Sequence, residues 1–244
     1  MSVRGTSHQK TGQPCQDASY YKIVKKNILV GAVADGAGSA PHGDEGAKVA
    51  ATEAVDTLAK HACKLTVKDD EQWKRLLLSA MNVARENVEA SAAGLNKPTR
   101  QLATTLILFV AMPDFIAAAQ IGDGAIVVQD RDGSIQSLTS PQSGEYINTT
   151  TFLVSPEASK SVQYNTWHRG YKSIAALTDG LQMLALTIPG GAPHPQFFAP
   201  LFAFRESAPD EKSADEELRS FLQSDKIISR ADDDLTLLLA TITR

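Results

Sequence analysis

The spacing of apolar residues changes near residue 100, and this change constrains the fold of the chain. Residues 44–61 and 69–92 carry apolar side chains at helical spacing, and Gly94 and Pro98 end the second segment. Short apolar segments follow, separated by turn-forming Gly, Pro and Asp residues. They predict four strands of one antiparallel meander, at residues 102–110, 115–121, 125–129 and 134–138.

The segments on either side of this block complete the expected architecture. A hairpin is predicted within residues 18–34, and residues 139–170 are polar, contain several breakers and are expected to be irregular. Helices in blocks combined with antiparallel strands indicate the α+β class. We therefore expect a single domain over residues 1–244, built as a four-layer α-β-β-α sandwich of two antiparallel sheets flanked by helices. The remaining predicted elements are a strand at 173–178, a helix from Gly180, helices at 197–204 and 211–223, and a final strand at 235–242.

Composition excludes several classes of protein. The net charge of -4 and the pI near 5.7 give no basic surface for nucleic acid. No stretch approaches the roughly 20 apolar residues of a membrane span, and the N-terminus lacks the apolar core of a signal peptide. Cys15 and Cys63 have no metal-type spacing, which is typical of reduced thiols in a cytoplasmic protein.

Four aspartates in separate stretches carry the strongest chemical signal: Asp17, Asp35, Asp179 and Asp233. Three of them adjoin an apolar run that is predicted to be a strand. Carboxylates that converge at strand ends repel one another in a low dielectric, and hard divalent cations with oxygen ligands relieve that repulsion. Taken singly, Asp35 also fits an ordinary Asp-Gly turn, Asp179 a helix N-cap and Asp233 a solvated acidic turn.

These aspartates belong to short motifs that occur in a recognisable order. The chain resembles the metal-dependent serine/threonine protein phosphatases of type 2C over nearly its whole length, and residues 144–149 resemble a feature of a bacterial branch of that family. The motifs that carry the resemblance are Gln16-Asp17, Ala34-Asp35-Gly36, Ala103-Thr104-Thr105, Gly122-Asp123-Gly124, Asp179-Gly180 and Asp233-Asp234-Leu235-Thr236.

The resemblance implies a phosphatase with two Mn²⁺ or Mg²⁺ ions, which hydrolyses phosphoserine and phosphothreonine. Asp35 would bridge both ions with help from the Gly36 carbonyl, and Asp17, Asp179 and Asp233 would complete the ligand set. Two such ions activate a water as the attacking hydroxide and neutralise the phosphoryl oxygens, so no covalent intermediate is needed. The implied partners are a phosphorylated protein and a cognate Ser/Thr kinase; a monomer is expected.

The chain departs from the family pattern at three places. Gly12 stands where the family has a phosphate-binding Arg, and the candidate substitutes are His8 first, then Lys10 and Arg4. Ala37 stands where some members carry a proton-donating His, which leaves His42 as the nearby candidate. Met183 replaces an Asp that helps to hold a third ion, so Asp123 would bind such an ion weakly or not at all.

Three questions stay open from the sequence. The departures also fit a regulatory or binding module with weak or lost activity on the same fold, and small phosphorylated molecules are a further substrate class. Residues 139–170, with Tyr146, Tyr164 and Trp167, are a candidate substrate gate or a loop without such a role. Asp232 and Asp234 are expected to be solvated or to lie in the outer shell around the ions.

Overall fold

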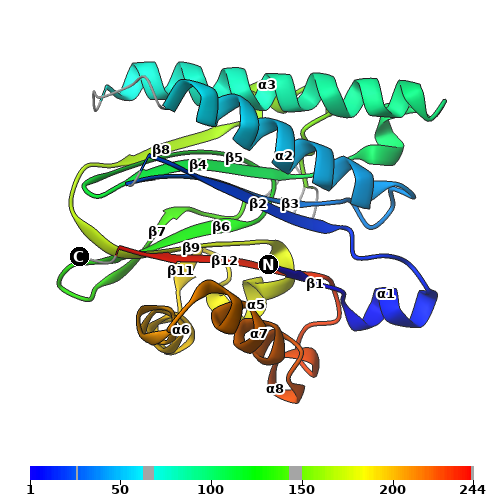
Figure 1. The fold of residues 1–244 in the computed structure, drawn as a ribbon. Coiled ribbons are helices and arrows are strands. Elements are labelled where there is room, and N and C mark those ends of the chain that lie inside the picture. The colour runs from blue at the N-terminus through cyan, green and yellow to red at the C-terminus, as the bar shows by residue number, and fades with distance from the viewer. Residues whose placement is uncertain (26, 63–68, 143–149, 243–244) are drawn as a thin grey trace.

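Two five-stranded antiparallel sheets lie face to face, with helices on both outer sides (Figure 1). This computed structural model describes residues 1–25, 27–62, 69–142 and 150–242. The arrangement confirms the predicted α-β-β-α sandwich. Apolar side chains fill three cores in series: one beneath each helical layer and one between the sheets.

The first sheet lies beneath two long helices, α2 (Gly43–Ala62) and α3 (Asp70–Gly94), as Figure 1 shows. Small buried residues of α2, such as Ala47, Ala50 and Ala54, let the helix backbone lie close to the strands. The order of the strands is β2-β3-β4-β5-β8. Their bounds are β2 Asp17–Val24, β3 Ile28–Asp35, β4 Leu106–Met112, β5 Phe115–Ile121 and β8 Gln163–Trp167. The 3-10 helix η1 (Thr99–Leu102) leads into β4.

The second sheet has the order β1-β12-β9-β6-β7 and lies over the C-terminal helices. Phe198, Leu201 and Phe202 of the helix α6 (Pro195–Ser207) pack beneath it.

None of the described helices combines the length and apolar character needed to cross a bilayer. The strands are β1 Ser2–Val3, β6 Ala125–Asp130, β7 Ile135–Thr139, β9 Tyr171–Leu177 and β12 Leu235–Thr241. The helical segments are η2 Asp179–Leu181, α5 Gln182–Ala185, α6 Pro195–Ser207, α7 Glu211–Leu222 and α8 Asp225–Ile228, and a small hairpin joins β10 Leu186–Thr187 to β11 Ala192–Pro193.

The predicted four-strand meander is wrong in its topology, because the chain changes sheets halfway along it. β4 and β5 pair in the first sheet, whereas β6 and β7 pair in the second. The turn Gly122-Asp123-Gly124 makes the crossing, and Gly122 has a φ of +105°. A Cβ on Gly124 would lie 2.4 Å from the carbonyl oxygen of Leu177, so only glycine lets the chain pass this close to β9. Asp123 is thereby placed between the sheets.

Two segments are more regular than expected. The N-terminal stretch contains a short helix, α1 (Thr6–Thr11), which ends at Gly12 in the left-handed conformation. Residues 139–170 contain the helix α4 (Ala158–Ser161) and the edge strand β8. Polar residues obscured β8 in the sequence, because its half-buried side chains are held by hydrogen bonds, such as Tyr164 Oη to the Asp70 carbonyl at 2.8 Å.

Asp69 caps the N-terminus of α3, because its side chain accepts hydrogen bonds from the backbone N–H groups of Glu71 (3.0 Å) and Gln72 (3.2 Å). We expect Asp69→Ala to lower the free energy of unfolding by about 1 kcal/mol. Urea denaturation measures this change. Asp69→Asn is the matched variant and retains most of the stability, because its side-chain oxygen still accepts; equal losses in both would contradict the capping role.

Candidate metal centre

The β2–β3 hairpin places two of the predicted aspartates side by side. Its register pairs Asp17 with Asp35 at the end of the first sheet. Asp17 is only 8% exposed, and Asp35 is half-buried. Beyond Asp35 the chain turns at Gly36, where a Cβ would lie 2.5 Å from the backbone of Gly43, so no larger residue fits.

The second sheet brings Asp179 to the same end of the sandwich. β9 ends at Leu177, and Thr178 separates the strand from Asp179. The Thr178 hydroxyl donates to the Asp17 carboxylate at 2.7 Å and accepts from the Thr236 backbone N–H at 3.1 Å. This hydroxyl therefore links acids and strands of both sheets, which sequence reasoning missed.

Asp35, Asp123 and Asp179 form a cluster in which one carboxylate oxygen from each lies within 4.8 Å of the others. Burial, together with the charges of Asp17 and Asp179, raises the pKa of Asp35 well above its usual value. Burial and the charges of Asp123 and Asp233 raise the pKa of Asp179 to about 6. Burial also raises the pKa of Asp17 to about 7, although the Thr178 hydroxyl opposes that shift. Asp17, Asp35 and Asp233 thus each lie within electrostatic reach of Asp179, as does Asp123.

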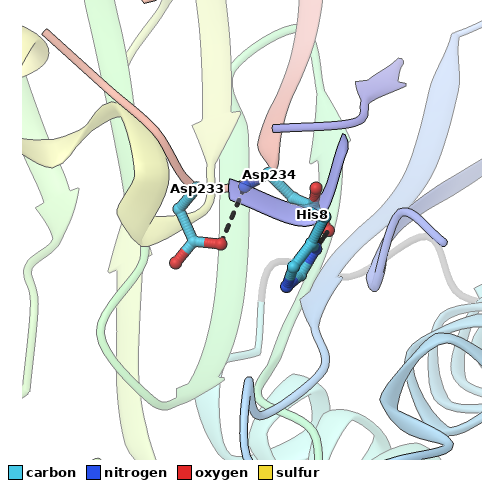
Figure 2. Close-up of side chains that lie close together, drawn as sticks. All are labelled: His8, Asp233 and Asp234. Carbon is cyan, nitrogen blue, oxygen red and sulfur yellow. Dashed lines mark hydrogen bonds and ion pairs between the residues drawn. The ribbon is translucent and has the colours of Figure 1, made fainter. Parts of the chain in front are cut away.

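A second cluster joins the N-terminal segment to the end of the chain. Ligand atoms of His8, Asp233 and Asp234 lie within 4.8 Å of one another. Figure 2 shows these three side chains close together. Asp233 is exposed, and its carboxylate accepts from the Asp234 backbone N–H at 2.8 Å. His8 is 7% exposed and its Nδ1 lies 2.8 Å from the Asp234 carboxylate. This His is therefore a buried, oriented group and not a surface side chain.

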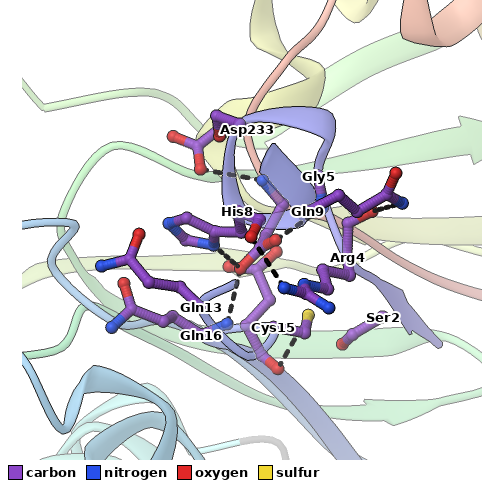
Figure 3. A network of polar contacts seen from close by, with 12 residues as sticks. Ser2, Arg4, Gly5, His8, Gln9, Gln13, Cys15, Gln16 and Asp233 are labelled. Atoms are coloured by element: carbon purple, nitrogen blue, oxygen red, sulfur yellow. Dashed lines mark hydrogen bonds and ion pairs between the residues drawn. The ribbon is translucent and has the colours of Figure 1, made fainter. Parts of the chain in front are cut away.

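Of the two alternatives expected for Asp234, solvation is wrong, because the side chain is buried; an outer-shell place stays a prediction. Asp234 is 2% exposed and accepts backbone hydrogen bonds from Gly5 at 2.6 Å and Gln16 at 2.5 Å. Figure 3 shows Gly5, His8 and Gln16 within this polar network. Sequence reasoning missed the burial of Asp234 because its donors lie more than 200 residues away along the chain. Asp232, by contrast, is exposed.

Three other predicted site residues, Arg4, Lys10 and His42, belong to neither of the two clusters found among the described residues. Lys10 is exposed on α1, and Arg4 directs its guanidinium to the carbonyl of His8 at 2.7 Å. His42 is half-buried at the start of α2, where its carbonyl accepts from the Gly46 N–H. Met183, the residue in place of a third-ion ligand, is 75% exposed.

The expected gate is only partly described. Tyr146 lies outside the described residues, while Tyr164 and Trp167 belong to β8, where Trp167 is 8% exposed and packs in the core between the sheets. These two side chains therefore hold the edge strand in place. Within this segment Thr150 contacts the site, because its hydroxyl donates a hydrogen bond to the Asp123 carboxylate at 2.6 Å.

Gly180 holds the Asp179 turn against the turn before β12. A Cβ at this position would lie 2.0 Å from the carbonyl oxygen of Asp234. We expect Gly180→Ala to lower the free energy of unfolding by roughly 1–3 kcal/mol and to weaken metal binding, because the turn must move away from β12. Denaturation and metal titration measure both effects. Gly94→Ala is the control, since no atom lies within 4 Å of its added Cβ; equal behaviour of the two variants would contradict the packing argument.

An α-β-β-α sandwich with carboxylates gathered from strand ends of both sheets defines a candidate metal-dependent enzyme. The sequence profile of the family described as protein phosphatase 2C matches residues 4–223. The chain is 36% identical to serine/threonine-protein phosphatase 3 of Escherichia coli (strain K12) over 248 residues, covering 98% of this chain and 95% of that protein. The chain belongs to the protein phosphatase 2C family, a metal-dependent family of phosphatases, as its motifs predicted.

Solved structures agree on the fold. Serine/threonine phosphatase Stp1 from Staphylococcus aureus superposes with a TM-score of 0.64 at 15% identity, covering 100% of this chain and 94% of that one. PppA, described as a key regulatory component of T6SS in Pseudomonas aeruginosa, gives 0.63 at 17% identity, with 98% and 94% covered. Nothing in these likenesses favours a module without activity.

Proposed function

We propose that this protein hydrolyses phosphoserine and phosphothreonine in proteins by direct attack of water, with two Mn²⁺ or Mg²⁺ ions at the acid-lined end of the sandwich. The observation that carries the proposal is the convergence of Asp35, Asp123 and Asp179 within 4.8 Å. Asp35, the Gly36 carbonyl, Asp17, Asp179 and Asp233 would hold the two ions. A third ion, if bound, would use Asp123.

The residues present fit such ions. Burial and the charges of neighbouring carboxylates raise the pKa values of Asp35 and Asp179, so a bound cation would stabilise their ionised forms. Oxygen donors suit the hard cations Mg²⁺ and Mn²⁺. The buried Oε1 of Gln16, next to Asp17 in the chain, accepts no hydrogen bond within the described part of the structure, so it is available to a water molecule of the hydrated ions. When bound, the ions supply positive charge that acidifies water and offsets phosphoryl charge.

The chain's own groups prepare the site for direct attack. Thr178 orients the Asp17 carboxylate, and the register of β2 with β3 sets it beside Asp35. Cys15 is not a nucleophile, because burial and the charges of Asp234 and Asp17 raise the pKa of its thiol to about 12. A protonated thiol does not attack phosphorus at neutral pH.

His8 takes the place of the family's phosphate-binding Arg, ahead of Arg4 and Lys10. Its support is that it lies in the cluster with Asp233, whereas Lys10 is exposed and Arg4 bonds to the backbone of α1. His42, at the start of α2, donates the proton to the departing serine or threonine oxygen. We further propose that residues 1–244 form one domain and that the protein acts as a monomer in the cytoplasm, where it opposes a Ser/Thr kinase.

Metal-dependent turnover tests this proposal. A phosphothreonine peptide, a nucleoside monophosphate and p-nitrophenyl phosphate are incubated with millimolar Mn²⁺ or with EDTA, and released phosphate is measured. We expect hydrolysis of the peptide with Mn²⁺ and none with EDTA, together with calorimetric binding of two Mn²⁺ ions. Equal rates in Mn²⁺ and EDTA would refute it; preference for the nucleotide would favour a small-molecule phosphohydrolase.

A further inference from the structure

The Asp234 carboxylate has no role in the phosphatase chemistry described above, yet it lies at the centre of a buried network. It accepts three hydrogen bonds, all from the N-terminal segment: from Gly5 N to Oδ1 at 2.6 Å, and from His8 Nδ1 (2.8 Å) and Gln16 N (2.5 Å) to Oδ2. A buried carboxylate with this many donors stays fixed in orientation.

Two of the groups that donate to this carboxylate, His8 and the Gln16 N–H, belong to or adjoin residues of the candidate site. Gln16 precedes Asp17, so its bond to Asp234 sets the start of β2. His8 is held by its Nδ1, which leaves Nε2 as the ring nitrogen that is free to meet a substrate. Figure 3 shows the His8 ring projecting to the same side as the Gln13 and Gln16 side chains, below the Asp233 carboxylate.

We propose that Asp234 is a positioning residue of this phosphatase: it accepts a hydrogen bond from His8 Nδ1–H, so that Nε2–H, with both ring nitrogens protonated, donates to a phosphoryl oxygen beside Asp233. The inference rests on the proposed function and adds to it a dyad of His8 and Asp234, which works in place of a bidentate Arg. A ring held at one nitrogen keeps the other in a fixed place, as in histidines that bind metals through an ordered partner.

This dyad couples two parts of the site through one group. The bonds to Gly5 and Gln16 place the loop before β2, while the bond to Nδ1 places the imidazole. A simple anchor of the N-terminus would need only the backbone bonds. A purely structural role for Asp234 does not explain the hydrogen bond between His8 Nδ1 and the Asp234 carboxylate.

A double-mutant cycle separates positioning from folding. His8→Gln, Asp234→Asn and the double variant are compared with wild type for kcat and KM on a phosphothreonine peptide with saturating Mn²⁺. We expect each single variant to lose roughly 10- to 100-fold in kcat/KM. The loss caused by Asp234→Asn should be smaller in the His8→Gln background than in wild type, because the part of its effect that passes through His8 is then already gone. Additive losses, or unchanged kcat/KM in His8→Gln, would overturn the proposal.

An NMR measurement and a control variant separate a failure of the dyad from a failure of the proposed phosphatase function. Nitrogen-15 NMR of the metal-free protein reports whether His8 Nδ1 carries a hydrogen-bonded proton; we expect this signal in wild type and its loss in Asp234→Asn. Its absence in wild type overturns the dyad even if the phosphatase is active, and its presence supports the dyad even if the wild type hydrolyses no peptide. If Asp234→Asn does not fold, His8→Gln and the wild-type spectrum decide. Asp232→Asn, an exposed neighbour in the same acidic run, is the control and should match wild type in every assay.

Discussion

Asp35→Asn should abolish most of the metal-dependent hydrolysis, with a loss in kcat of at least roughly 10²–10³-fold. The expected loss is large because Asp35 belongs to the cluster with Asp123 and Asp179 and is predicted to bridge both ions. An amide carries no charge and cannot bridge two cations. Steady-state hydrolysis of a phosphothreonine peptide with Mn²⁺ measures the loss, and calorimetry should show weaker binding of Mn²⁺.

The same variant is expected to fold at least as well as wild type when metal is absent. Burial and the charges of neighbouring aspartates raise the pKa of Asp35, so removing its charge relieves both penalties. Asp114→Asn is the matched control, since Asp114 is an exposed acid paired with Arg131 at 2.8 Å. An Asp35→Asn enzyme with wild-type kcat would show that Asp35 has no catalytic role.

Without metal, the protein should lose stability as pH rises from about 4 to about 7, and Mn²⁺ should restore it. The pKa of Asp17 is raised by burial to about 7 and that of Asp179 by burial and nearby charge to about 6. Between an unfolded pKa near 4 and these values, the folded state holds protons that the unfolded state has released. The stabilising contribution is therefore complete below that window and lost above it, with a size of a few kcal/mol.

Denaturation in EDTA near pH 5 and near pH 7.5 measures this effect, and a repeat with Mn²⁺ measures its reversal. Protons and cations play the same part, since each neutralises the carboxylates, so Mn²⁺ should stabilise most at the higher pH. Asp17→Asn is expected to flatten the slope in EDTA. A metal-free wild type that gains stability between these pH values would contradict the raised pKa values.

Local pattern was enough to predict most elements but not how they are joined in space. The bounds of β5 follow from its apolar run between a Pro-Asp turn and Gly122, and the predicted and observed strands coincide. Turn chemistry at 122–124 looks the same in a hairpin and in a crossing between sheets, which is why the meander was predicted. Only the steric limits at Gly122 and Gly124 distinguish them, and these depend on Thr105 and Leu177.

In the candidate site, too, the sequence predicted what depends on neighbouring residues and missed what depends on residues far along the chain. Three of the four aspartates were predictable because they adjoin an apolar run, and strand ends are determined locally; Asp17 was predictable only from its place in the ordered set of motifs. The burial of His8 was not predictable, because it depends on Asp234, 226 residues further along the chain. Nor could the sequence show that Arg4 would bond to the carbonyl of His8, because the short helix α1 brings the two together.

The division of the acids between the two sheets has a mechanical consequence. Asp17 and Asp35 belong to one half of the sandwich, whereas Asp179 and Asp233 border strands of the other half. A cation shared among them would join the two halves at one end, adding to the apolar packing between the sheets and to polar contacts such as the hydrogen bond from Thr178 to Asp17. Metal-dependent activity would then depend on the alignment of the two sheets. A small shift of one sheet relative to the other would separate the ligands and abolish activity before the protein unfolds.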